Sequence, residues 1–341
     1  MKVYSRATLG AVLSLLASST LPAQDHASQF ELTRAFVTDW AHGPVRDVAV
    51  NLFCGDPKSG PAGPVHAPDK DCELHTGAQL SDPSISDFQG VVLEPPNVCA
   101  EQGKNWRTAI NAFANKDCVA HGFVRVWPEH LTSGSGCSNP NHFMELHPLQ
   151  TLKCGGTDVL DFTSKLRVVE GLGYKSVSIV RQMMGLQLWV CEGCGGGSSE
   201  ANLTPIEFDY CFGANCKRGQ ASNFARFQAK VLPATIRPKP DQTLEGFATA
   251  IARVLPVDQN GQSSGTRFEL LKLYALKGSD FYDKLLAIQK AGGTPPPLDI
   301  IGIFTVEPLS VLKVIEKPDF PHATWVSVPF PVALVVFGET P

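Results

Sequence analysis

Three side chains in one short apolar segment, His142, Glu145 and His147, have the types and spacing that metal binding or acid–base chemistry needs. On a strand, Glu145 and His147 project to one face with Cβ atoms about 6–7 Å apart, while His142 projects to the other. Imidazole and carboxylate are both zinc ligands, and a carboxylate can also orient a histidine for proton transfer. His121 and His130 are near in sequence and could join such a site. The segment is therefore a candidate catalytic or zinc site.

A purely structural role for the same pair is the interpretation we favour. The order His-x-x-Glu-x-His differs from the helical His-Glu-x-x-His of metalloproteases, whose two histidines share one helix face. The period of a strand also keeps all three side chains from meeting. We expect a Glu145–His147 hydrogen bond that ties this strand to a neighbouring loop, with Pro148 ending or bending the ladder.

The N-terminus has the features of a secretion signal. Lys2 and Arg6 precede an apolar stretch at 7–21, and Ala23 offers a small residue before Gln24. We expect residues 1–23 to be a cleaved signal peptide and the protein to be secreted or periplasmic. The first residue after the cleavage position is Gln24 and not a cysteine, so a lipid anchor there is not indicated.

Ten cysteines follow this segment, and in an exported chain an even number of cysteines first indicates disulfides. Pairing near neighbours predicts Cys54–Cys72, Cys99–Cys118 and Cys137–Cys154.

Cys191, Cys194, Cys211 and Cys216 have the spacing of a structural zinc site, so zinc is the alternative there. Export favours two disulfides that join Cys191 and Cys194 to Cys211 and Cys216. Redox activity ranks third, because three glycines follow Cys194 instead of a helix that would stabilise a thiolate.

Composition and charge exclude several classes of protein. The net charge is −4 and no run of basic residues occurs, which argues against a nucleic-acid partner. No later segment reaches the ~18–20 apolar residues of a membrane-spanning helix.

No nucleophile motif is complete. Ser133-Gly134-Ser135-Gly136 lacks the Gly-x-Ser-x-Gly order of a nucleophile elbow. We expect no cofactor other than a possible zinc ion.

Short apolar runs separated by glycine and proline are typical of a mainly β protein with a few short helices, and an α+β fold is the alternative. The order of elements predicts two small barrel-like domains of the OB type, or sandwiches, stabilised by disulfides. We place them at residues 24–165 and 166–341. Strands expected in them include 30–37, 45–53, 88–93, 119–127, 143–152, 224–232, 247–255, 266–276, 300–306, 311–315, 324–328 and 332–337.

Two helices are also predicted. Residues 104–116 carry Trp106, Ile110 and Phe113 on one face. Ser279 can cap a helix over 280–290 that Gly292 ends. Residues 224–233 and 247–256 are similar in sequence, which we interpret as two paired strands rather than a repeat, although 247–255 would also suit a helix.

A resemblance covers residues 87–152. The segments that carry it are Pro95-Pro96-Asn97-Val98-Cys99, the helix near Trp106–Phe113, His121-Gly122-Phe123-Val124-Arg125-Val126-Trp127 and Asn141-His142-Phe143-Met144-Glu145-Leu146-His147-Pro148-Leu149. In this order they resemble a group of uncharacterised exported bacterial proteins with a closing Glu-Leu-His-Pro strand. A Phe-Phe-Asp element of that group is missing here. The resemblance implies an exported, barrel-like domain and brings no activity.

No complete catalytic constellation emerges, so the leading hypothesis is a non-enzymatic binding or interaction module for an unknown protein or small-molecule ligand. The first alternative is a metal-dependent hydrolase that uses Glu145 and His147. The second is a structural component of a cell-surface assembly, in which an open strand edge recruits a partner chain or a second copy.

Overall fold

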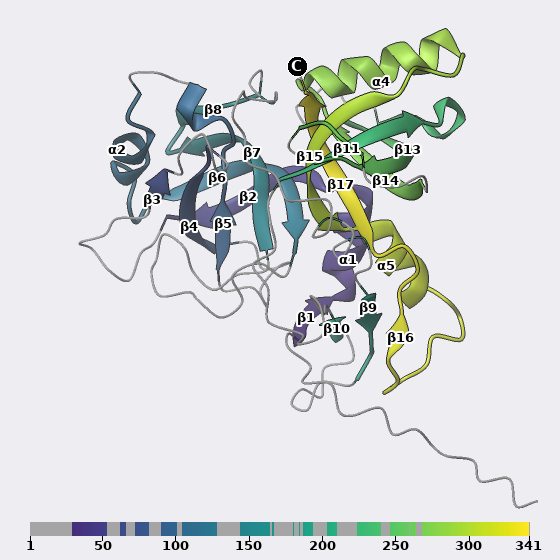
Figure 1. The fold of residues 1–341 in the computed structure, drawn as a ribbon. Coiled ribbons are helices and arrows are strands. Elements are labelled where there is room, and N and C mark those ends of the chain that lie inside the picture. The colour runs from purple at the N-terminus through teal and green to yellow at the C-terminus, as the bar shows by residue number, and fades with distance from the viewer. Residues whose placement is uncertain are drawn as a thin grey trace, which may run out of the picture.

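The structure is a computed structural model, drawn in Figure 1. It describes residues 29–52, 62–65, 72–81, 90–100, 104–127, 144–163, 166, 180, 184, 187–193, 203–209, 224–239, 246–258, 260–263 and 268–340. The described residues are mostly strand with four α-helices, which confirms the predicted mainly β fold. The predicted signal peptide lies outside the described residues. None of the helices that the structure describes has the length and apolar character to cross a membrane.

The first barrel closes from five strands. Their bounds are β2 (Val45–Asn51), β4 (Leu74–Leu80), β5 (Val91–Leu93), β6 (Asp117–Val126) and β7 (Met144–Cys154). They pair in the ring order β2-β6-β7-β5-β4, and a β2–β4 pairing completes the ring. The β5–β7 pairing is parallel and the others are antiparallel. Two strands extend this sheet, β3 (Ala62–Val65) on β4 and β8 (Thr157–Asp161) on β7, while η2 (Val98–Ala100) and α2 (Trp106–Asn111) lie between β5 and β6.

The second barrel repeats this plan. Its strands are β11 (Phe224–Val231), β13 (Phe247–Pro256), β14 (Glu269–Leu276), β15 (Leu298–Val306) and β17 (Val332–Glu339). They pair in the ring order β11-β15-β17-β14-β13, a β11–β13 pairing completes the ring, and β14–β17 is the parallel pair. Further elements are η3 (Pro233–Thr235), β12 (Arg237–Lys239) on β13, α4 (Asp280–Ala291) between β14 and β15, and α5 (Pro308–Ile315) between β15 and β17.

Strand order, the parallel pair and the position of one helix are the same in both barrels. Counted along the chain, the strands of each ring follow the order 1-4-5-3-2, and a helix joins strands 3 and 4. This arrangement is the five-stranded Greek-key barrel of the OB type. The predicted pair of OB-like barrels is therefore confirmed.

A third sheet takes strands from both ends of the chain and lies below the second barrel in Figure 1. It runs in the order β1 (Gln29–Thr33), β10 (Leu203–Asp209), β9 (Gln187–Val190) and β16 (Val326–Ser327). Helix α1 (Arg34–His42) packs against α5. Arg34 ties these elements together through Nε to Glu192 Oε1 at 2.7 Å and through a guanidinium N–H to the Ile315 carbonyl at 2.9 Å.

Two segments predicted as strands are helical. The expected strand 30–37 ends at Thr33, whose hydroxyl accepts from the Phe36 N–H and caps α1. Residues 311–315 belong to α5, because Glu307 caps a helix that Pro308 begins. In both segments the apolar residues pack on one helical face, so the period of burial, and not their β-branched content, decided the structure.

Other predicted elements are confirmed. Ser279 accepts from the Tyr282 N–H at the start of α4, and Gly292 ends that helix at φ 67°. The helix expected over 104–116 is shorter, at Trp106–Asn111. The similar segments 224–233 and 247–256 contain β11 and β13, which pair antiparallel as interpreted.

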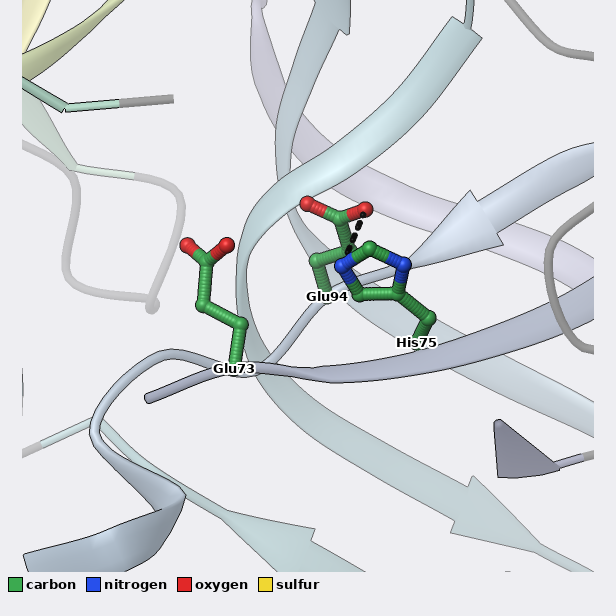
Figure 2. A group of neighbouring side chains, drawn as sticks. All are labelled: Glu73, His75 and Glu94. Carbon is green, nitrogen blue, oxygen red and sulfur yellow. Dashed lines mark ion pairs between the residues drawn. The ribbon is translucent and has the colours of Figure 1, made fainter. Parts of the chain in front are cut away.

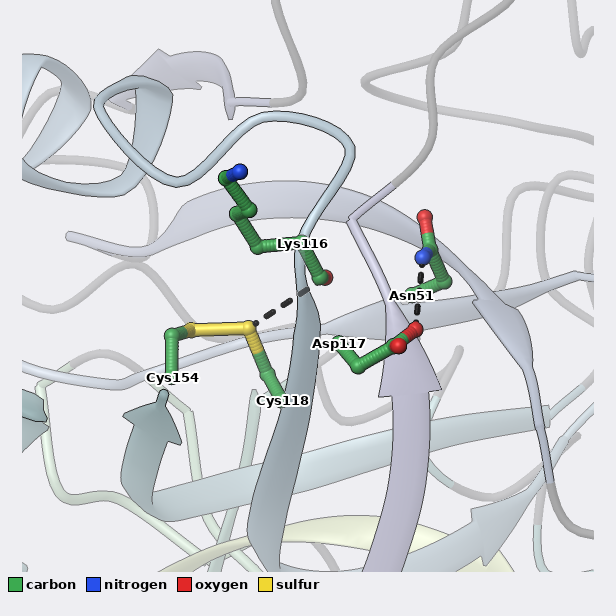
Figure 3. The surroundings of a disulfide bond; sticks show 5 residues. All are labelled: Asn51, Lys116, Asp117, Cys118 and Cys154. Carbon is green, nitrogen blue, oxygen red and sulfur yellow. Dashed lines mark hydrogen bonds between the residues drawn. A yellow bond between two sulfur atoms is a disulfide. The ribbon is translucent and has the colours of Figure 1, made fainter. Parts of the chain in front are cut away.

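The predicted near-neighbour disulfides are wrong. Cys72 pairs with Cys99, and Cys118 pairs with Cys154. Figure 3 shows the second bond, which joins directly opposite residues of β6 and β7 beside the Asn51–Asp117 hydrogen bond. Sheet register, rather than sequence spacing, therefore selects the partner. Cys54 and Cys137 lie outside the described residues.

Candidate functional site

Glu145 and His147 lie on the same face of β7, as their spacing on a strand predicts, and this face is the outer wall of the first barrel. They alternate along β7 with Met144 and Leu146, which belong to the hydrophobic core. Both polar side chains are nevertheless 0% exposed. Buried charged groups need partners, and four more polar side chains gather around these two.

The sheet register brings these partners together. Arg125 on β6 lies directly opposite Glu145 on β7. The parallel register of β5 and β7, continued by one residue, places Glu94 beside His147. The antiparallel register of β4 and β5, continued in the same way, places Glu94 beside His75. Glu73, two residues before His75, adds a further carboxylate. We call these six residues, Glu73, His75, Glu94, Arg125, Glu145 and His147, the charged cluster.

His147 is held between carboxylates. Its Nε2 lies 2.6 Å from Glu73 Oε1 and its Nδ1 lies 2.5 Å from Glu94 Oε2. Glu145 Oε2 is farther from the same Nδ1, at 3.6 Å. Both ring nitrogens therefore face an acceptor, as in a doubly protonated imidazolium.

The second barrel covers this part of the outer wall. The rings of Phe224 and Phe337 contact the His147 ring edge-on, with centroids 6.4 and 6.2 Å away. Arg125 pairs with Glu145 and also donates from Nε to the Phe304 carbonyl at 2.7 Å. The charged cluster thus lies at the joint between the barrels.

Glu94 links the two histidines. Its Oε2 faces His147, and its Oε1 lies 3.3 Å from His75 Nε2. Figure 2 shows the carboxylates of Glu73 and Glu94 on the same side of the sheet as the His75 ring. All three side chains are buried.

The electrostatics of the cluster favour an ionised Glu94 and a cationic His147. Burial by itself lowers the pKa of His147, but the charges of Glu73 and Glu94 raise it well above its usual value. Burial raises the pKa of Glu94, but the charges of His75 and His147 outweigh burial and the repulsion of Glu145 and lower it to about 2. An imidazolium that contacts carboxylates at both nitrogens has no lone pair with which to act as a base.

The remaining predicted ligands do not join this group within the described residues. His121 lies on β6 with Nδ1 at 2.8 Å from Asp47 Oδ1, outside the charged cluster. His142 and His130 lie outside the described residues, as do Cys194, Cys211 and Cys216. Cys191 is disulfide-bonded, so it is not available as a zinc-binding thiolate.

Four members of the charged cluster were missed from the sequence: Glu73, His75, Glu94 and Arg125. Glu73 and His75 flank the apolar Leu74 with a period of two, which could have marked them as one face of a strand. Their proximity to His147 depends on strand pairing that no local pattern contains.

Comparison with known proteins adds no family. No protein-family model matches the chain, and no curated protein matches it. The resemblance of residues 87–152 to exported bacterial proteins stays a prediction.

Proposed function

We propose that this protein is an exported, non-enzymatic binding module that holds its partner on the outer face of β13 and β14. The observation that carries the proposal is a difference between the barrels. In the first barrel the corresponding strands, β4 and β5, have their outer face buried at the charged cluster. In the second barrel, Ile251 on β13 and Leu270 on β14 remain 39% and 53% exposed.

These two aliphatic side chains belong to one surface. Arg253 pairs directly with Leu270, and Ile251 pairs with Lys272, so Ile251 and Leu270 are diagonal neighbours. Lys230 of β11 extends the row on the other side of Arg253. We call Lys230, Ile251, Arg253 and Leu270 the β13–β14 patch. Strands 2 and 3 of an OB barrel form the face on which such folds bind ligands.

The charge and the apolar character of the β13–β14 patch indicate which class of partner it would bind. Two aliphatic side chains beside two neighbouring cations suit an acidic peptide segment that carries its own aliphatic residues. Phe247 and Tyr274, the aromatic side chains of the same two strands, are buried, and the Lys230 ammonium lies over the ring of Phe268, one residue before β14. The described face therefore offers little for stacking sugars or bases, and a protein partner is the better fit.

Disulfides support export. Cys72–Cys99 and Cys118–Cys154 are formed, and Cys191 is also disulfide-bonded. Such bonds persist in oxidising compartments.

Burial speaks against the hydrolase alternative. Glu145 and His147 are both 0% exposed, and Arg125 neutralises Glu145. A substrate would have to separate the barrels to reach them.

Fluorescence anisotropy with two designed peptides tests the binding proposal. One peptide alternates Glu with Leu, and its control has Lys in place of each Glu. We expect the acidic peptide to bind in a salt-sensitive manner and the basic one to bind at least ten-fold more weakly. Ile251→Asp with Leu270→Asp, and separately Arg253→Glu, should each weaken binding ten-fold or more.

Val119→Asp is the matched control. Val119 is 42% exposed on β6 of the first barrel, so the substitution adds the same charge to a similar surface elsewhere. Equal binding of both peptides, or an equal loss of binding in Val119→Asp, would refute the proposal.

A further inference from the structure

We propose that Glu73, His75 and Glu94 form a binding site for one divalent transition-metal ion of the zinc class at the joint between the barrels. This site is separate from the β13–β14 patch and does not depend on it. It also differs from the metal sites predicted from the sequence, which used His142, Glu145 and His147 or the cysteines.

Distances in the cluster fit metal ligation. One ligand atom from each of the three residues lies within 4.8 Å of the other two. His75 Nε2 and Glu94 Oε1 are 3.3 Å apart. Two ligands that each lie 2.0–2.1 Å from a tetrahedral zinc ion are about 3.4 Å apart. A charge-assisted N–H···O hydrogen bond is shorter, at about 2.7–2.9 Å.

Rigid backbone holds the three ligands. Glu73 and His75 project to the same face because they are two residues apart on one extended segment. Glu94 follows β5, and its N–H donates to the Leu146 carbonyl at 3.1 Å while its carbonyl accepts from the Leu149 N–H at 3.0 Å. The Cys72–Cys99 disulfide anchors the chain one residue before Glu73.

The charge of the cluster also favours a bound cation. Glu73, Glu94 and Glu145 carry three negative charges when ionised, and Arg125 and the cationic His147 supply two positive charges. One negative charge therefore remains among these buried side chains.

The chemical types of the three ligands limit which metal ion the site would bind. One imidazole with two carboxylates suits zinc and its neighbours, whereas calcium takes six to eight oxygen ligands. Each of the three ligands is at most 2% exposed, so the ion would be shielded from bulk solvent. His147 contacts both carboxylates, so it would orient them around the ion.

The first test is metal content together with X-ray absorption on the full mature protein. The protein is stripped with a chelator, incubated with zinc chloride and passed over a desalting column. We expect about one zinc per chain, a zinc-edge spectrum with one imidazole and only nitrogen or oxygen ligands, and a higher Tm than that of the stripped protein. Folded protein that retains no zinc would overturn the proposal. Sulfur ligands would also overturn it, because they would place zinc at cysteines.

Variants locate the site. His75→Gln and Glu73→Gln should each reduce retained zinc at least ten-fold. Glu307→Gln is the matched control, since Glu307 is a buried, ion-paired carboxylate in the second barrel, and it should retain zinc fully. Undiminished zinc in folded His75→Gln would refute the site. If the variants do not fold, the ligand spectrum of the wild-type protein still tests the proposal, because a second imidazole or a sulfur ligand would overturn it.

Discussion

At the scale of single residues, His147 is a buried histidine whose charge balances two buried carboxylates. It is fully buried and contacts carboxylates at both ring nitrogens. Removing one partner from a buried ion pair is costly because the other partner keeps its desolvation without compensation. The stability of the joint should therefore depend on this side chain.

His147→Ala tests this dependence in chelator-treated protein. We expect a loss of about 3–5 kcal/mol in the free energy of unfolding, because Glu73 and Glu94 lose their shared cation. His121→Ala is the control, since its partner Asp47 is largely exposed and the pair contributes about 0–1 kcal/mol. Urea unfolding measures both, and equal losses would show that the carboxylates do not depend on His147.

Glu307 gives a pH dependence that can be measured. Burial raises its pKa, but the charge of Lys272 and the bonds from Lys272, Tyr274 and the Ser310 N–H lower it below 4.5. A folded-state pKa below the unfolded value stabilises the protein above pH 4.5, and this contribution disappears as pH falls through the lowered pKa. The stability of wild-type protein should therefore fall more steeply between pH 5 and pH 3 than that of Glu307→Gln. Parallel curves in urea unfolding would contradict this assignment.

At the scale of elements, the two glycines that flank α4 differ in what a side chain would meet. Both have a left-handed backbone, but only one of them is closely packed. Gly278 and Gly292 both have positive φ, at 89° and 67°. A Cβ on Gly278 would lie 2.2 Å from the Thr163 carbonyl oxygen, whereas a Cβ on Gly292 would meet nothing within 4 Å. Gly278 therefore allows the start of α4 to approach the segment that follows the first barrel.

Alanine substitutions test this close approach. Gly292→Ala should cost about 1 kcal/mol, the usual penalty of a left-handed residue with a Cβ. Gly278→Ala should cost at least twice as much, because the backbone of Thr163 must also move. Thermal unfolding of the two variants measures the difference. Equal melting temperatures would show that the Thr163 backbone moves aside without a measurable cost in stability.

At the scale of the whole molecule, aromatic and charged contacts join the two barrels. Trp127 stacks on Phe304, Phe123 meets Tyr274 edge-on, and Arg125 bonds the Phe304 carbonyl. Both disulfides with two described partners lie in the first barrel. Weakening that barrel should therefore also weaken the second one through the buried joint.

Replacing Cys118 and Cys154 together with alanine tests this coupling. The loss of a disulfide with a sequence separation of 36 should cost about 2–4 kcal/mol. We expect the slowest hydrogen exchange to accelerate in β14 and β17 as well as in β6 and β7. Acceleration confined to the first barrel would mean that the barrels unfold independently.

The sequence by itself determined the features that depend on local pattern. Turn residues between short apolar runs predicted two OB-like barrels, Ser279 and Gly292 marked the ends of α4, and the period of two put Glu145 and His147 on one face. Only the tertiary structure decided which strands are neighbours. The β4–β5, β5–β7 and β6–β7 pairings brought Glu73, His75, Glu94 and Arg125 to that pair, and the same pairings selected Cys72–Cys99 and Cys118–Cys154. The physical reason is that strand pairing joins residues distant in the chain, and burial at the joint then requires each of their charges to find a partner.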